Sequence, residues 1–340
     1  FIHIIRSSKD PTEARERLTA AVEALSDNPD ADTVRALQQL AGLEVFAGTA
    51  DAGRVTEEAV VLAQRLALEQ DDLSGVFGIR AVWLTQNGRR PEAIAFQREA
   101  ARLAEKAGNS GRQGITLMNL SDVLAPVDPA AALETARVAA GHLRRTGLRG
   151  YLIYALCNLV TSSLEVGDWD AAEAILTVTV QEDGVEEHDE IACYRALFAA
   201  LRGDVSTAEP LLAGLGELLQ TEAPQERAFV LQAKAFTAAA AGRTRDAFDL
   251  ARQVVTLADA LGIGSEQPRW NWPLAVRSAY ELGDAAAVRE LLELLDAAQP
   301  GDIVPLLVSG RALARACLAD LEGDGEAGRL FTTAVTSLRE

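Results

Sequence analysis

The stretch Gly242–Ala258, GRTRDAFDLARQVVTLA, decides how the chain folds. Gly242 and Arg243 form a short turn that leads into a helix. Apolar side chains recur on one face of that helix: Ala247, Leu250, Ala251, Val254 and Leu257. The preceding segment, residues 228–241, is rich in alanine, which allows two helices to pack closely. Together the two segments predict one helix–turn–helix hairpin.

The same turn recurs along the chain, so the sequence predicts a repeat protein. Each turn starts with a glycine and carries a small residue five positions later. The turn glycines are Gly88, Gly167, Gly203, Gly242, Gly283 and Gly323. A further turn over residues 125–132 keeps the spacing without a glycine, and the turns are about 36 to 41 residues apart. Glycine supplies the left-handed backbone that ends one helix, an Asp after it can cap the next, and the small residue lets the two helices cross closely.

The pattern predicts about eight antiparallel hairpins that follow a first helix. That helix opens at Asp10–Pro11 and closes at Asn28–Pro29, and we expect it to be the second half of a truncated repeat. The predicted hairpins pair residues 32–46 with 55–68, 71–86 with 90–107, 109–124 with 129–145, 148–165 with 169–180, 186–201 with 205–219, 224–241 with 244–261, 267–282 with 285–297, and 303–321 with 326–338. The first and last helices should be partly exposed because each lacks one neighbour.

This chain resembles the tetratricopeptide repeat (TPR) family, whose mid-repeat positions match the Gly…Ala turn pairs. It departs from the family in two respects: its repeat is nearer 39 residues than 34, and the family's early Trp, Leu and Gly and its closing Pro are mostly absent. The resemblance covers roughly residue 10 to the end. It implies an all-α, right-handed α-solenoid (superhelix) of TPR-like hairpins. We therefore predict a single domain over residues 10–340, and a disordered or upstream remnant over residues 1–9.

Composition narrows the classes of partner. Hydrophobic residues make up 49% of the 340 residues but aromatic residues only 5%, which suits close helix packing. The net charge of −18 and the absence of long Lys/Arg runs argue against direct contact with nucleic acid or with an anionic membrane. No apolar run approaches the roughly 20 residues that span a bilayer. The start at Phe1 carries neither an initiator Met nor a signal-peptide pattern, so we expect a piece of a longer chain.

The sequence holds no residue set that indicates catalysis, and we predict a protein that is not an enzyme and has no cofactor. Its three histidines lie at no metal-ligand spacing, and neither a nucleophile elbow nor a phosphate-binding loop is present. The acidic residues between Glu182 and Glu190 lack the order of a calcium loop, so we expect a solvated acidic loop. Cys157, Cys193 and Cys317 lie in apolar helical runs, which predicts buried small hydrophobes in a reducing, cytoplasmic setting.

In this architecture the first helix of each hairpin usually lines the concave groove. Aligning the first helices on the turn glycine predicts a polar and basic column: Arg80, Asn119, Arg195, Lys234 and Arg315. Leu159 and Ala275 interrupt the column, although Asn158 and Arg277 lie close by. Such a stripe would favour an acidic peptide, a carboxylate terminus or an anionic ligand. The alternative is that these residues pair with acidic neighbours on adjacent helices.

Aromatic residues also concentrate in the first helices, and the run Arg269–Pro273, RWNWP, is the most unusual. Trp270 and Trp272 could form one wall of a pocket. They could equally serve in packing between repeats, with Pro273 in the first turn of its helix.

Longer, degenerate repeats of this kind resemble the helical sensor regions of bacterial regulators. Examples are the maltose-activator type of LuxR-family regulators, actinobacterial antibiotic regulators and peptide-sensing helical regulators. The resemblance implies a scaffold that binds a protein or peptide partner in its groove, within a larger actinobacterial transcriptional or signalling regulator. The alternatives are a free-standing TPR adaptor and an enzyme on an α/α toroid. A receptor for chaperone tails would need a Lys–Asn–Asn–Lys–Arg pattern that this chain does not assemble.

Overall fold

The computed structural model describes residues 11–221 and 223–337, and every regular element within them is a helix. The chain divides into two compact units, residues 1–185 (unit 1) and residues 186–340 (unit 2). The helices of unit 1 are α2 (Pro11–Ala24), α3 (Ala31–Ala47), α4 (Ala52–Arg65), α5 (Gln70–Gln86), α6 (Arg90–Lys106), α7 (Ser110–Leu124), α8 (Pro129–Thr146), α9 (Arg149–Glu165), α10 (Trp169–Ala174), the π-helical turn η1 (Ile175–Thr179) and α11 (Val180–Glu182).

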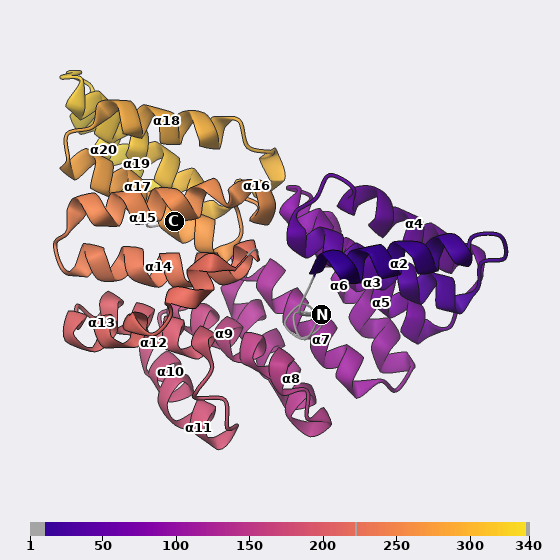
Figure 1. Ribbon diagram of the computed structural model, residues 1–340. Helices are drawn as coiled ribbons and strands as arrows, with labels where there is room; N and C mark the ends of the chain where they lie inside the picture. The colour runs from indigo at the N-terminus through magenta and orange to yellow at the C-terminus, as the bar shows by residue number, and fades with distance from the viewer. Residues whose placement is uncertain (1–10, 222, 338–340) are drawn as a thin grey trace. The chain divides into compact units, whose positions relative to one another are not determined.

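The helices of unit 2 are α12 (Asp189–Leu201), α13 (Val205–Ala213), the 3₁₀ turn η2 (Gly216–Gln220), α14 (Pro224–Ala240), α15 (Thr244–Thr256), α16 (Ala258–Leu261), α17 (Glu266–Glu281), α18 (Ala285–Asp296), the 3₁₀ turn η3 (Pro300–Asp302), α19 (Pro305–Leu321) and α20 (Ala327–Ser337). In both units, helices that follow one another in sequence pack side by side (Figure 1). Over the described residues they form the eight predicted hairpins after α2, so the predicted all-α fold of TPR-like antiparallel hairpins is confirmed within each unit. The single-domain prediction for residues 10–340 stays a prediction, and residues 1–9 lie outside the described part.

The turns predicted from the sequence join the two helices of the hairpins in the structure. All six predicted turn glycines have positive φ, between 69° at Gly88 and 82° at Gly167. The Asp that follows three of them caps the second helix: a backbone N–H donates to Asp168, Asp204 and Asp284 at 3.0 to 3.1 Å. The glycine-free turn is capped in the same way by Asp128, at 3.0 Å. The turns at Gly167, Gly203 and Gly283 therefore satisfy both the end of one helix and the start of the next, whereas Arg89 and Arg243 after Gly88 and Gly242 form no such cap.

The small residue five positions after the turn lies where the two helices of a hairpin cross. Ala93, Ala172, Ala208 and Ala247 are all essentially inaccessible to solvent. The loop at residues 47–53 contains the same pattern, which the sequence analysis did not count as a turn of this kind. Gly48 has a φ of 67°, and five residues later a Cβ on Gly53 would come within 2.7 Å of the Trp83 ring.

Three second helices are less regular than the sequence predicted. The predicted helix over residues 169–180 changes to a π-helical turn after Ala174, at a place that carries neither Gly nor Pro. The predicted helix over residues 205–219 ends at Ala213, because Pro210 removes a backbone donor and Gly214 follows. The predicted helix over residues 244–261 is divided into α15 and α16 at Leu257.

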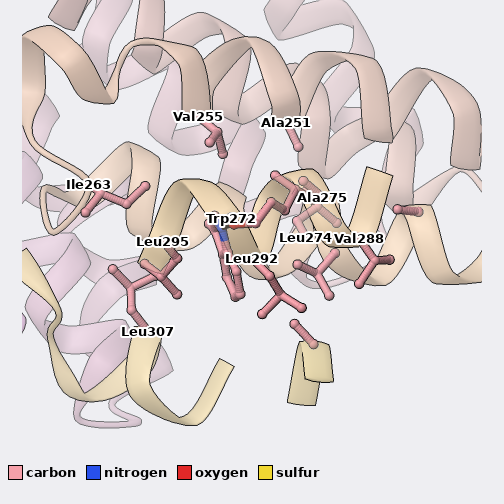
Figure 2. Packing of buried hydrophobic residues seen from close by; sticks show 14 of the residues in the cluster. Ala251, Val255, Ile263, Trp272, Leu274, Ala275, Val288, Leu292, Leu295 and Leu307 are labelled. Atoms are coloured by element: carbon pink, nitrogen blue, oxygen red, sulfur yellow. Dashed lines mark hydrogen bonds between the residues drawn. The ribbon is translucent and has the colours of Figure 1, made fainter. Parts of the chain in front are cut away.

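The core is a series of local clusters, as expected for a stack in which each hairpin buries its apolar face against its neighbours. The largest cluster lies in unit 2, where Trp272 of α17 is surrounded by aliphatic side chains from α15 to α19 (Figure 2). The outermost helices are the most open, as predicted. No described side chain of α2 falls in the buried class, and in α20 only Ala327 and Ala334 are buried.

Candidate functional site

The predicted first-helix column is distributed over both units, and we describe each unit by itself. Arg80, Asn119 and Asn158 lie in α5, α7 and α9 of unit 1. Arg195, Lys234, Trp270, Arg277 and Arg315 lie in α12, α14, α17 and α19 of unit 2. The contacts of each side chain decide whether it is available to a partner or already bound within the chain.

Arg80 is bound within the chain. Its Nη1 donates to the Gly53 carbonyl and to Thr56 Oγ1, both at 2.9 Å, and both acceptors belong to α4. The guanidinium also lies 4.3 Å from the centre of the Trp83 ring. Burial lowers the pKa of Arg80, and the nearby carboxylate of Glu57 partly offsets that effect. Arg80 therefore ties α5 to the second helix of the preceding hairpin.

The two asparagines of the column differ. Asn158 Nδ2 donates to the Met118 carbonyl at 3.0 Å and to Ser121 Oγ at 2.9 Å, so this amide ties α9 to α7. Asn119 is half-buried in α7, and its side chain has no hydrogen-bond partner among the described residues. Of the unit 1 members, Asn119 alone keeps an unused amide, and its role in a groove stays a prediction.

In unit 2, Arg195 and Lys234 occupy equivalent positions on adjacent first helices. Arg195 Nη1 donates to the Glu186 carbonyl at 3.4 Å. Lys234 is half-buried in α14, and its positive charge lies close enough to α12 to act on the pKa of the Cys193 thiol. Within residues 11–221 and 223–337, no side chain forms an ion pair or hydrogen bond with the Lys234 ammonium.

The other two cations of unit 2 form exposed ion pairs. Arg277 lies 3.5 Å from Glu281, one turn along the same helix. Arg315 lies 3.5 Å from Asp296, at the end of α18. Both arginine side chains are more than half exposed, so each pair contributes only a few tenths of a kcal/mol. Both guanidinium groups remain accessible to a partner.

The two tryptophans of the RWNWP run have separate roles. Trp272 is completely buried among aliphatic side chains (Figure 2). Its Nε1 donates to the Leu291 carbonyl at 2.9 Å. It is therefore a packing residue, as one of the two alternatives proposed. Trp270 is half-buried and meets Phe236 edge to face, with ring centres 6.4 Å apart. The position predicted for Pro273 was wrong: it lies inside α17, because the helix begins at Glu266 and Pro268 occupies the first turn.

One buried polar contact of unit 2 has no signal in the sequence. The Tyr194 hydroxyl in α12 donates to the Glu266 carboxylate, 2.7 and 2.8 Å from its two oxygens. Both residues are buried, and they come from first helices that are separated by a whole hairpin. No local pattern links residues 72 positions apart, so only the folded chain could show this contact.

The prediction of a solvated acidic loop between Glu182 and Glu190 was wrong at two of its residues. Asp183 accepts hydrogen bonds from Arg144 at 2.7 to 2.9 Å, and its side chain is only 11% exposed. Glu190 is buried at the start of α12. The guanidinium of Arg144 compensates the burial of Asp183, which the acidic sequence alone could not indicate.

The cysteines are buried free thiols, as predicted. Burial raises the pKa of Cys317 to about 11 and raises that of Cys193 further, which keeps both protonated. Among the described residues, no helix is both long and apolar enough to cross a membrane. Over the same residues, no group of three or more His, Cys, Asp or Glu side chains is placed to hold a metal ion.

Comparisons with known proteins add little to this description. No protein-family model matches the chain, and no curated protein sequence matches it. Among solved structures, the structure of Naa15/Naa10 bound to HypK-THB contains a similar chain, with a TM-score of 0.31 and 14% sequence identity. The alignment covers 98% of the present chain but only 62% of that chain. At this TM-score the similarity supports no argument about function.

Proposed function

We propose that the chain is a non-enzymatic scaffold that binds a protein or peptide partner through the first helices of its hairpins. The observation that carries the proposal is Lys234, a half-buried residue whose ammonium has no anionic partner among the described residues. A cation that the chain leaves without a partner gains a charge-assisted contact when an anion pairs with it. The partner would therefore present a carboxylate at this position.

Comparison with equivalent positions supports a binding role for Lys234. Arg80, at the same position of its hairpin, is satisfied by the preceding helix α4. Arg315, also at that position, has an exposed carboxylate beside it. Lys234 has neither, and Arg277 on the following first helix offers a second accessible cation. A scaffold of this kind would suit the sensor or interaction region of a larger cytoplasmic bacterial regulator, with the flanking parts of that protein supplying the output.

The test uses an acidic decapeptide with a free carboxyl terminus, and binding is measured by fluorescence anisotropy. Replacing Lys234 with Met removes the charge but keeps the apolar stem, and should weaken binding about tenfold, since a charge-assisted contact contributes about 1.5 kcal/mol. Arg252→Met, which removes an exposed charge paired with Glu290 on the second helix α15, is the matched control and should bind like the wild type. Equal affinities for the wild type and Lys234→Met would refute the role of Lys234, and no binding to the wild type would refute the proposal of an anionic partner.

A free-standing adaptor differs from a regulator's sensor region only in what accompanies it in the full reading frame. An ATPase and a helix-turn-helix segment encoded beside this region would support the regulator. A frame that encodes only further helical repeats would support the adaptor.

A further inference from the structure

One segment with an excess of positive charge stands out in an otherwise acidic chain. Residues 98–149 contain eight Lys or Arg and five Asp or Glu, whereas the whole chain contains 32 and 50. In unit 1 this segment runs from the middle of α6 to the start of α9, and α6, α7, α8 and α9 pack in succession (Figure 1). The local excess of positive charge is thus gathered on neighbouring helices.

Half of these cations are neutralised within the unit. Arg102 pairs with Glu99, Arg112 with Asp71, Arg137 with Glu134 and Arg144 with Asp183. The other four are exposed and form no ion pair with any residue in the described ranges: Arg98, Lys106, Arg145 and Arg149. Charges that the fold does not neutralise remain available to an external anion.

Three of the four unpaired cations lie at the same end of the hairpins. Lys106 ends α6, Arg145 lies in the last turn of α8, and Arg149 begins α9. We call Lys106, Arg145 and Arg149 the basic edge.

His142 shows that the ends of α6 and α8 lie close to the start of α7. Its Nδ1 is 2.9 Å from Ser110 Oγ at the start of α7. Burial and the charge of Arg145 lower the pKa of His142, while Glu105, beside Lys106, acts in the opposite direction. Charges at the end of α6 and at the end of α8 therefore both lie close enough to act on the His142 imidazole.

The starts of α7 and α9 add to the positive potential, while Glu105 and the loop at Glu182 and Asp183, which Arg149 approaches at Gly184, reduce it. The first turns of α7 and α9 contain no acidic residue. Arg112 and Arg149 occupy those turns, although the partial positive charge of a helix N-terminus disfavours a cation there. Most of the other helices have a carboxylate in the first turn, which stabilises the helix N-terminus. The helices α7 and α9 lack this stabilising carboxylate.

We propose that the basic edge docks an acidic segment of a partner protein. Complementary charge favours this partner. A short run of carboxylates can contact the three cations without approaching the acidic residues on the rest of the surface. A nucleic acid would extend beyond the basic edge and meet the field of a chain whose net charge is −18. The basic edge belongs to unit 1 and Lys234 to unit 2, so the basic edge adds a second contact to the proposed scaffold.

The test uses the full chain and a hexaglutamate peptide that is acetylated and amidated, so that it offers side-chain carboxylates only. Nuclear magnetic resonance of the His142 side chain reports binding at the basic edge. The bound carboxylates should counter the charge of Arg145 and raise the pKa of His142. The double variant Arg145→Gln/Arg149→Gln should bind the peptide about tenfold more weakly, as expected for two exposed charge contacts.

Two controls separate the outcomes. Arg137→Gln, an exposed arginine on α8 that is paired with Glu134, should bind the peptide like the wild type. Lys234→Met should leave the peptide-induced rise in the pKa of His142 unchanged, because that readout is local to the basic edge, so failure here is distinct from failure of the proposed function. Equal binding by the wild type and the double variant, or an unchanged pKa of His142 at saturation, would overturn the proposal. Tighter binding of a DNA duplex than of the peptide would overturn it in favour of a nucleic-acid surface.

Discussion

Replacing Arg80 with Met tests whether this arginine is a structural tie or a group that binds a partner. Its Nη1 makes two hydrogen bonds to α4, each worth about 1 kcal/mol net. The contact with the Trp83 ring adds about 0.5 to 1 kcal/mol. Glu57 is 67% exposed and adds at most a few tenths of a kcal/mol.

Two effects reduce the loss. Methionine keeps the apolar stem of the side chain, and removing the guanidinium also removes the cost of burying it, the same cost that lowers the pKa of Arg80. We expect a net loss of about 2 kcal/mol in the free energy of unfolding of unit 1.

The assay is urea unfolding followed by far-ultraviolet circular dichroism. With a slope of about 2 to 3 kcal/mol per molar urea, the midpoint of the affected transition should fall by about 0.8 M. Arg315→Met removes a single exposed ion pair, so its midpoint should stay within about 0.2 M of the wild type. A midpoint for Arg80→Met equal to that of the wild type would refute the structural assignment and make Arg80 a candidate for partner binding again.

Two further predictions concern packing and pH. Gly310→Ala would place a Cβ 3.1 Å from Cζ3 of the fully buried Trp272, which should cancel the gain of about 1 kcal/mol that alanine normally brings to a helix. Gly141→Ala meets only the flexible end of a side chain, at 3.5 Å, and should raise the melting temperature; a comparable rise for Gly310→Ala would contradict the packing argument. Because burial and Arg145 lower the pKa of His142, the folded state binds fewer protons than the unfolded state near pH 6. Stability should therefore fall between about pH 7 and about pH 5, and His142→Gln should flatten that dependence in urea midpoints; an unchanged slope would count against it.

Much of the fold was predictable because its determinants are local. The turn at Gly242 needs only a residue that accepts positive φ, and the caps at Asp168 and Asp204 involve an N–H three positions away. The alanine five positions after Gly88, Gly167, Gly203 and Gly242 marks the helix crossing for an equally local reason. These signals fixed the hairpins, their number over the described residues and their all-α class.

The candidate site was less predictable because a position on a helix does not determine what a side chain meets. Arg80 and Lys234 are equivalent in sequence, yet Arg80 finds a carbonyl and a hydroxyl in the preceding helix and Lys234 finds no partner among the described residues. Asn158 likewise forms its hydrogen bonds with α7, about 40 residues earlier. Internal pairing was one of the two alternatives that the sequence left open, and it holds for some residues of the column only.

The sequence by itself therefore determined the elements, the repeat and the hairpins, since the causes of these features lie within a few residues along the chain. Tertiary structure alone decided which polar residues are already satisfied, as for Tyr194 with Glu266 and Arg144 with Asp183. It also decided that Lys106, Arg145 and Arg149 form no ion pair with any of the described residues. The physical reason is the same in each case: a hydrogen bond or a charge acts over a few ångströms of space, and stacking of the hairpins, not distance along the sequence, sets which groups come within that range.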